Sequence, residues 1–475
     1  MPLTVNVKWG KQQFKGVELH TDKPIDEFKV QLFSLSGVPV ERQKVMIPRS
    51  GQLKDDTTWD KYKLKDGMTI MLVGSVEEFK APEKETVFME DLPPTETFSV
   101  DYQPGLMNYG NTCYLNSTVQ VLSKIPTLQD SLIKYSRNAG SSDAVSRNLG
   151  VLVGNLKDKG NSFLSLSNFI QSFRAVYPQF AEKGPNGGFM QQDAEECFSV
   201  ILQSLRNVPG VIQGDIISDL FEGRFNVTTK CIENGDEPSE TTVEPFQKIA
   251  VHIGNDTSFL STAIKNRMME QFDKNSPSLG REAIYEKITK ISKLPYYLPI
   301  QFVRFFWRQD KNVRAKICKP VDFPFRLDLF EYCDEELQKS LAPNREAVRI
   351  AEEEKIHKNR GKKEEEEKKE GETKQEDTEM KDAEEVEDAK EIILENDTGL
   401  YDLVGVISHR GRSADGGHYV AWVKKDENNW LLYDDDKVSI VSPEEIKKLT
   451  GHGGADWHIA YVCIYESLRK DSLVN

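Results

Sequence analysis

Residues 105–117 read GLMNYGNTCYLNS, and they place a single thiol at the start of a predicted helix. The apolar residues after Cys113 recur at helical spacing, and this pattern ends before Pro126. Cys113 therefore lies in the first helical turn, where unpaired backbone N–H groups and the positive end of the helix dipole favour a thiolate. We interpret Cys113 as a candidate nucleophile, with the side-chain amide of Asn108 upstream. The alternative is a buried structural cysteine, which is the more common role of an isolated cysteine.

A predicted β-hairpin far along the chain bears on this choice. Residues 415–423 (DGGHYVAWV) and 430–436 (WLLYDDD) are rich in aromatic and aliphatic strand formers. The polar residues 424–429 separate them, so the two segments predict antiparallel strands joined by a short connection.

The register of this hairpin brings a histidine to a carboxylate. Pairing Val423 with Trp430 sets the register. Counting back along both strands then places His418 opposite Asp435, one residue from Asp434. An imidazole that takes the thiol proton and a carboxylate that fixes its tautomer are the partners that a cysteine nucleophile needs. Each segment alone is better explained as a turn histidine or a solvated acidic run, but together with the thiol they indicate a catalytic site.

The order of these motifs resembles the ubiquitin-specific protease family of papain-like cysteine peptidases. In that family a cysteine box opens the catalytic domain, and a Gly-His-Tyr box with a downstream aspartate closes it. Three further segments are similar to family motifs: the glutamine box QQDAEE (191–196), the strand LPYYL (294–298) with RF at 304–305, and the closing strand AYVCIY (460–465). The resemblance implies an α+β protein with the fingers, palm and thumb of a papain-like ubiquitin-specific protease domain.

The resemblance also implies the catalytic roles. Cys113 attacks the carbonyl of ubiquitin's C-terminal glycine, His418 acts as base and then as acid, and Asp434 orients His418. Asn108 and the backbone N–H of Cys113 donate hydrogen bonds to the oxyanion. Asp435 remains an alternative orienting carboxylate, since the hairpin count does not exclude it.

Three more residues receive substrate-binding roles from the resemblance. Gln192 and Asp193 line the channel that receives ubiquitin's flexible tail, and Tyr419 packs over its two glycines. The expected substrates are ubiquitin and polyubiquitinated proteins.

The first 75 residues form a separate predicted unit. Alternating apolar residues predict an opening hairpin, and Ile25, Phe28, Leu32 and Leu35 recur at helical spacing until Gly37. Two short apolar runs, KVMI at 44–47 and TIMLV at 69–73, complete an order that resembles a ubiquitin-like β-grasp domain.

The resemblance to ubiquitin-like domains implies that Met46, Met71 and Val73 form an exposed apolar patch on this domain. Neighbouring residues of a strand face opposite ways, so in the alternative these three are core and Val45 and Ile47 are exposed. Family members with an N-terminal ubiquitin-like domain and no zinc ribbon resemble this chain most. That resemblance implies docking on the proteasome regulatory particle through the ubiquitin-like domain.

Residues 76–100 have the proline and charge content of a flexible linker, and the catalytic domain is predicted over 101–470. Residues 345–397 form an insertion with 12 basic and 21 acidic residues, a net charge of −9 out of −15 for the chain. Apolar residues are sparse there, so we expect disorder or a fraying solvated helix. This acidity argues against nucleic-acid binding.

The cysteines indicate in which cellular compartment the protein works and whether it binds zinc. The six cysteines are scattered, and no secretory segment or membrane-length apolar run is recognised, so we expect no membrane insertion and a reducing compartment. This predicts the cytoplasm, alone or together with the nucleus. The chain has no Cys-x-x-Cys pair, so we expect no structural zinc and no cofactor.

Three functions are consistent with these observations. The first is a deubiquitinase that hydrolyses bonds at ubiquitin's C-terminal glycine on proteins delivered to the proteasome. The second is a ubiquitin receptor or allosteric proteasome adapter with weak free activity. The third is a peptidase for another ubiquitin-like modifier. The presence of all four catalytic residue types favours the first.

Overall fold

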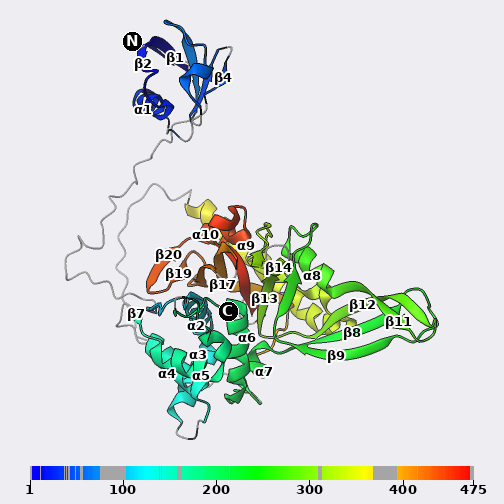
Figure 1. Cartoon of the computed structure of the whole chain (residues 1–475). Helices are drawn as coiled ribbons and strands as arrows, with labels where there is room; N and C mark the ends of the chain where they lie inside the picture. The colour runs from blue at the N-terminus through cyan, green and yellow to red at the C-terminus, as the bar shows by residue number, and fades with distance from the viewer. Residues whose placement is uncertain are drawn as a thin grey trace. The chain divides into compact units, whose positions relative to one another are not determined.

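The computed structural model divides the chain into two compact units, Met1–Thr97 and Phe98–Asn475 (Figure 1). It describes residues 3–74 and 103–470 except positions 11, 37, 39, 41–42, 49, 54–56, 139, 141, 158–162, 186, 213, 309–312, 367–392 and 414–415. The predicted linker at 76–100 lies outside the described residues. No helix among the described residues has the length and apolar content of a membrane span.

The described part of the first unit has a five-stranded sheet, in the order β2-β1-β5-β3-β4, and the α-helix α1. Its elements are β1 (Leu3–Trp9), β2 (Gln12–Leu19), α1 (Ile25–Ser36), β3 (Lys44–Ile47), β4 (Gly51–Gln52) and β5 (Thr69–Val73). Ile25, Phe28 and Leu32 of α1 pack into the core, as their spacing predicts. Leu35 lies in the same helix, as its spacing predicts, but its side chain is exposed.

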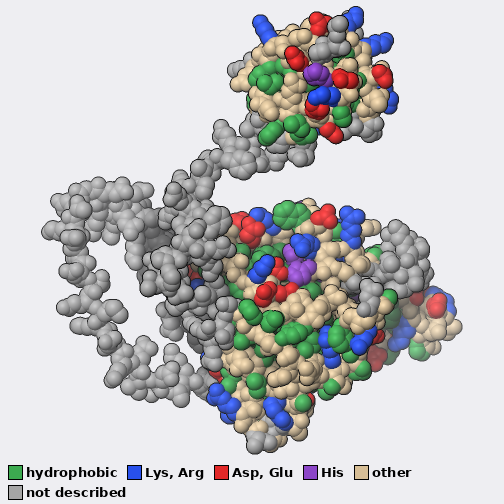
Figure 2. Space-filling view, turned by 60° about the vertical axis from the view of Figure 1, so that its left-hand side comes forward, with side chains coloured by type: hydrophobic (Ala, Val, Ile, Leu, Met, Phe, Trp, Pro, Cys, Tyr) green, Lys and Arg blue, Asp and Glu red, His purple; other side chains and the backbone are tan. Residues whose placement is uncertain are grey.

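The sheet of the first unit presents apolar side chains on its outer face. Met46, Met71 and Val73 are 40%, 51% and 49% exposed, whereas Val45 and Ile47 are 0% and 2% exposed. Met46 pairs with Met71 across β3 and β5, so the side chains of the patch are neighbours. The predicted exposure of this patch is confirmed. Figure 2 shows hydrophobic side chains among charged ones of both signs on the visible faces of both units.

The second unit is built around a ten-stranded sheet. Seven of its strands follow the order β10-β13-β21-β17-β18-β19-β20, and β14, β15 and β16 pair at its side. The strands of the unit are β6 (Gly105–Leu106), β7 (Phe163–Leu164), β8 (Gly223–Cys231), β9 (Glu240–Phe246), β10 (Ile249–His252), β11 (Met269–Ser276), β12 (Arg281–Lys293), β13 (Tyr297–Val303), β14 (Phe305–Arg308), β15 (Val313–Lys316), β16 (Arg326–Asp328), β17 (Leu400–Ser413), β18 (Gly416–Lys424), β19 (Trp430–Asp434), β20 (Lys437–Val441) and β21 (Ile459–Ser467).

Helices cover the sheet, and those from α2 to α7 gather on one side of it (Figure 1). The helices are α2 (Cys113–Leu122), α3 (Pro126–Arg137), α4 (Ala144–Lys157), α5 (Ser167–Val176), α6 (Ala194–Ser204), α7 (Ile216–Phe221), α8 (Leu260–Met268), α9 (Glu335–Glu366) and α10 (Pro443–Lys447). Strand β18 shows how the sheet separates two cores. Tyr419 and Ala421 pack into the core shared with α2, while Val420 and Trp422 pack into the other.

A four-stranded sheet, β11-β12-β8-β9, projects from the main sheet (Figure 1). A small cluster of Cys231, Ala283 and Tyr285 is buried in it. The Glu237 carboxylate accepts hydrogen bonds from the hydroxyls of Ser276 and Tyr285 beside this cluster. These contacts tie the chain segments of this sheet together.

Helix α9 contains the first part of the charged insertion. Its residues from 345 to 366 are helical, and residues 367–392 lie outside the described residues. Arg345 holds the helix to the domain because its guanidinium donates to both oxygens of Asp328, at 3.0 and 2.6 Å, and to the carbonyl of Thr398.

Candidate active site

Helix α2 begins at Cys113, with Thr112 before it. All ten residues of α2 are buried, and the helix packs against α6 and against strands β17, β18 and β19. A helix surrounded in this way holds its first turn in a fixed position relative to the sheet. The Cys113 thiol is therefore buried at the helix N-terminus, where the dipole favours a negative charge.

His418 on β18 lies between Cys113 and Asp434. His418 Nε2 and Asp434 Oδ1 are 2.5 Å apart. Hydrogen bonding to Asp434 and then to Cys113 raises the pKa of His418 to about 10, and the bond from His418 lowers the pKa of Asp434. The imidazole is thus held as an imidazolium between a carboxylate and a thiol, which is the charge distribution that supports a thiolate.

The hairpin that carries this pair has a different register from the predicted one. Val423 pairs with Leu431, and Lys424 pairs with Trp430, so the prediction is wrong by one residue. The carboxylate of Asp426 accepts hydrogen bonds from the backbone N–H groups of residues 428 and 429, both at 2.9 Å. These bonds make the turn shorter than the predicted connection, so Lys424 belongs to the strand.

Asp435 has a different set of partners from Asp434. Asn108 Nδ2 donates to Asp435 Oδ2 at 2.8 Å, and Asn116 Nδ2 donates to Asp435 Oδ1 at 2.7 Å. Asp435 adopts the left-handed conformation (φ 54°), and its carbonyl accepts the N–H of Leu106 at 2.8 Å. Asp435 therefore fastens the cysteine segment to the end of the hairpin.

Gly105 makes this contact possible. A β-carbon at Gly105 would lie 2.5 Å from the carbonyl carbon of Asp436, closer than any side chain tolerates. Any other residue would push the cysteine segment away from the hairpin.

The side chain of Asn108 is fixed at both ends. Its oxygen accepts the N–H of Thr112 at 3.2 Å, while one N–H of its amide goes to Asp435. A carboxamide has two N–H donors, so Asn108 has a second N–H that the bond to Asp435 does not use. The Asn108 side chain is exposed.

Comparison with known proteins identifies the family. The family model described as ubiquitin carboxyl-terminal hydrolase matches residues 104–465, and the ubiquitin family model matches residues 3–77. The chain belongs to the ubiquitin carboxyl-terminal hydrolase family. Its catalytic domain is of the ubiquitin-specific protease type with an N-terminal ubiquitin-like domain, which confirms the predicted family and fold class.

Three relatives match over nearly the whole chain. Ubiquitin carboxyl-terminal hydrolase 6 of Arabidopsis thaliana is 41% identical over 98% of this chain and 98% of its own length. Ubiquitin carboxyl-terminal hydrolase 14 of Caenorhabditis elegans is 37% identical over 98% of this chain and 94% of its own length. Hydrolase 6 of Schizosaccharomyces pombe is 36% identical, with coverage of 98% and 99%. This protein is therefore a cysteine-type deubiquitinase.

A solved structure supports the fold. The SAGA Ubp8/Sgf11/Sus1/Sgf73 DUB module bound to ubiquitin aldehyde matches 77% of this chain and 70% of the solved chain, with a TM-score of 0.53 and 21% identity. The overall fold of this part of the chain is thus one already seen in a solved protein.

The deubiquitinase has a cleft of about 470 Å³ beside α6 and β14. Asp193 lines it and also caps α6, since Asp193 Oδ1 accepts the N–H of Glu195 at 2.8 Å. The hydroxyl of Tyr461 donates to the Asp193 carboxylate at 2.7 Å. Gln192 is half-buried beside Asp193.

Tyr419 is not on the surface of this cleft. Its side chain is buried, and its ring centroid lies 4.5 Å from that of His409. Side chains alternate along β18, and the side chain of Tyr419 points into the core next to α2. In this structure Tyr419 is therefore not accessible for the predicted contact with the glycines of ubiquitin.

Sequence reasoning missed two neighbours of the catalytic residues. Asn116 binds Asp435, and its position in the first turn after Cys113 is the one signal that could have indicated it. The ring of His458 lies 6.2 Å from that of His418, and its Nδ1 is 3.1 Å from the hydroxyl of Ser408. Burial lowers the pKa of His458 to about 3, so this second ring stays neutral.

Three side chains of the site are of types that can bind a metal ion. Among the described residues, His418, Asp434 and Asp435 are the one group of three potential ligands that converge. His418 is held in its protonated form by Asp434, and Asp435 accepts hydrogen bonds from two asparagines, so a metal ion would have to displace a proton and disrupt these bonds. The arrangement therefore fits proton transfer better than metal binding.

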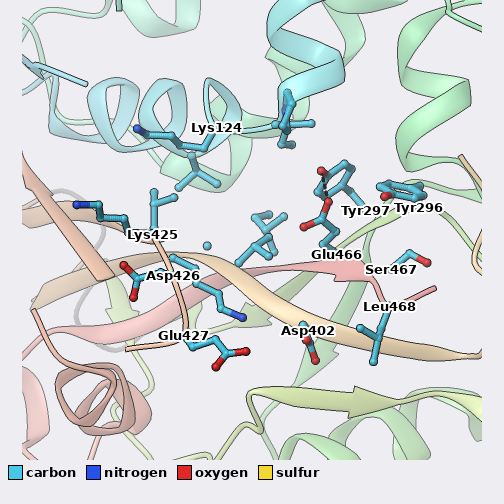
Figure 3. A pocket seen from close by; sticks show the side chains of 18 residues that line it. Lys124, Tyr296, Tyr297, Asp402, Lys425, Asp426, Glu427, Glu466, Ser467 and Leu468 are labelled. Atoms are coloured by element: carbon cyan, nitrogen blue, oxygen red, sulfur yellow. Dashed lines mark hydrogen bonds between the residues drawn. The ribbon is translucent and has the colours of Figure 1, made fainter. Parts of the chain in front are cut away.

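A separate cavity of about 570 Å³ lies at the C-terminal end of α2 (Figure 3). The carboxylate of Glu466 points toward the ring of Tyr297, whose hydroxyl donates to it at 2.6 Å. Lys124, Lys425 and Glu427 surround the opening, so its edge carries both signs of charge. None of the predicted site residues lines this cavity.

Proposed function

We propose that this deubiquitinase acts on ubiquitinated proteins at the proteasome, in the cytoplasm or the nucleus, with Cys113 as its nucleophile. The bond between His418 and Asp434, with Cys113 at the other side of the imidazole, is the observation that carries the catalytic assignment. The exposed patch of Met46, Met71 and Val73 supports docking.

The thiolate of Cys113 attacks the carbonyl carbon of ubiquitin's C-terminal glycine. The imidazolium of His418 gives its proton to the departing amine, and a thioester forms as the C–N bond breaks. Water then attacks the thioester, His418 accepts a proton from it, and the Cys113 thiolate leaves. Asp434 keeps the imidazole in one tautomer and stabilises its charge throughout.

The oxyanion formed in both steps needs hydrogen-bond donors. The backbone N–H of Cys113 and the second N–H of Asn108 are the proposed donors. Loss of such a donor costs roughly 3–4 kcal/mol of transition-state stabilisation. Asp435 acts here as a positioning residue, because it fixes the amide that would donate.

Ubiquitin's tail is proposed to enter the cleft lined by Asp193, with Gln192 at its side. Contact with Tyr419 would require this side chain to leave its buried position. The ubiquitin-like domain would bind the proteasome regulatory particle through its apolar patch, since apolar side chains at the centre of an interface carry much of the binding energy.

Purified proteasomes test this proposal directly. The protein is mixed with proteasomes, separated by size, and the proteasome fraction is assayed with a ubiquitin C-terminal fluorogenic substrate. We expect hydrolysis in that fraction to require the added protein and to disappear after treatment with a ubiquitin vinyl electrophile. Activity that stays entirely in the unbound fraction would refute docking, and a proteasome fraction that binds the protein without hydrolysis would favour the adapter function.

A further inference from the structure

A buried lysine and a buried histidine face each other next to the strand that carries His418. Lys316 ends β15, His409 lies in β17, and both side chains are buried. Lys316 Nζ donates to the carbonyl oxygen of His409 at 2.6 Å and lies 3.1 Å from His409 Nδ1. No step of the reaction described above uses either residue.

The charges of the pair define the direction of the second hydrogen bond. Burial, and then the nearby charge of Lys316, lowers the pKa of His409 to about 3, so the ring is neutral at physiological pH. Burial lowers the pKa of Lys316 to about 8, so the amine keeps its proton for the most part at pH 7. An ammonium group has no acceptor, so Nδ1 of His409 must be the acceptor. The ring therefore has one orientation.

The other edge of the His409 ring lies against Gly417, the residue before His418. A β-carbon at Gly417 would lie 2.6 Å from His409 Nε2 and 2.2 Å from the carbonyl oxygen of Arg410. A β-carbon at Gly411 would lie 2.9 Å from the Cα of Gly417 and 3.3 Å from Cε1 of His409. Gly411 and Gly417 have positive φ angles of 129° and 120°. The backbone before His418 thus rests directly on the imidazole ring of His409.

The pairing of β17 with β18 also connects His409 to His418. His409 pairs with Tyr419, and Arg410 pairs with His418. On the other side, Lys316 pairs with Phe305 of β14, whose ring lies 5.4 Å from that of His409. A displacement of His409 would therefore change the position of His418.

We propose that Lys316 and His409 are positioning residues that set the orientation of His418. This inference rests on the proposed role of His418 as the catalytic base. Lys316 fixes the His409 ring, the ring supports the glycine backbone, and that backbone fixes the residue that follows it. Neither Lys316 nor His409 contacts the reacting atoms.

Three variants of the full chain test the pair. Lys316→Met keeps an apolar stem and removes the donor, His409→Phe keeps a ring and removes the acceptor, and the third variant carries both changes. Each single change should lower kcat on a ubiquitin fluorogenic substrate about tenfold with little change in KM, because small displacements of a catalytic group cost one to two orders of magnitude. The double variant should be no slower than the worse single one, because the two residues act as one unit.

Lys319→Met is the matched control. Lys319 is a lysine of the same segment whose amine donates to the carbonyls of Gly254 and Asn255, so its removal should leave kcat unchanged. The rate of Cys113 alkylation by iodoacetamide should fall with kcat in the Lys316 and His409 variants. Single variants with kcat within twofold of the wild type, or losses that multiply in the double variant, would overturn the proposal.

His409→Asn covers the case in which a variant fails to fold. An asparagine oxygen can replace Nδ1 as the acceptor for Lys316. At equal melting temperature, His409→Asn should be faster than His409→Phe, and equal losses would refute the positioning role. His418→Ala separates this proposal from its premise: an active His418→Ala variant would mean that His418 is not the base, whereas an inactive one with a normal Lys316→Met variant would reject the pair alone.

Discussion

The two units of this protein place their functional side chains in opposite ways. In the ubiquitin-like unit, Met46, Met71 and Val73 lie on two neighbouring strands and point away from a small core. In the catalytic unit, Cys113 and His418 are about 300 positions apart in the sequence and meet only because α2 packs on β18. If the patch docks the protein as proposed, a local change should therefore remove docking alone, whereas catalysis depends on the contacts between distant segments.

The largest effect is expected at the nucleophile. Cys113→Ser should abolish labelling by a ubiquitin vinyl electrophile, because a hydroxyl at this position is not ionised and does not react. Cys197→Ala is the control, since Cys197 is a core residue of α6 and its removal should leave labelling intact. Labelling that persists in the Cys113 variant would show that another thiol is the nucleophile.

The next largest effect separates Asp434 from Asp435. Asp434→Asn removes the carboxylate that binds His418, and loss of a triad orienter costs about 10⁴ in kcat in serine proteases. Asp435→Asn should cost about 10- to 100-fold, because it loosens Asn108 and Asn116 rather than His418 and misplaces a catalytic donor. Steady-state kinetics on the fluorogenic substrate compares them. A nearly normal Asp434→Asn variant with a disabled Asp435→Asn variant would reverse the two roles.

A smaller and local effect is expected at the docking patch. Met46→Asp should greatly weaken binding to proteasomes and leave free hydrolysis unchanged, because a charge is costly to bury at the centre of an apolar interface. Phe33→Asp is the matched control, since Phe33 is an exposed apolar residue of α1 outside the patch. If binding falls with Phe33→Asp and survives Met46→Asp, the docking surface is on the helix.

The smallest effect concerns pH and stability. His458 is buried and has its pKa lowered to about 3, while an unfolded histidine titrates near 6.5. The unfolded chain therefore binds more protons between these values, and the free energy of unfolding decreases as the pH falls through this window. We expect a lower melting temperature at pH 5 than at pH 7, and a shallower decline in His458→Gln. An identical decline in both proteins would assign it to other groups.

Local patterns in the sequence predicted most of the ubiquitin-like unit. The spacing of Ile25, Phe28 and Leu32 sufficed for the helix. Strand alternation separated the two faces of the strands, and the resemblance to ubiquitin-like domains indicated which face is exposed. The exposure of Leu35 was missed because the pattern does not say how wide the buried face of α1 is.

The catalytic unit was less predictable beyond its motifs. The hairpin could be placed, but its register depended on the turn that Asp426 organises. The bonds of Asp435 depend on a left-handed residue and on the close approach of Gly105, which only the packed fold reveals. Lys316 and His409 are 93 positions apart on strands that pair only in the sheet, so neither residue gave a signal.

The division between the two units is tested most directly by one measurement: hydrolysis of a ubiquitin fluorogenic substrate after deletion of residues 1–75, with and without proteasomes. The deletion removes the patch and none of the catalytic residues. The truncated protein should therefore keep the free activity of the full chain and should neither co-purify with proteasomes nor respond to them. Loss of free activity would show that the first unit supports the catalytic one, and unchanged proteasome binding would place the docking surface elsewhere.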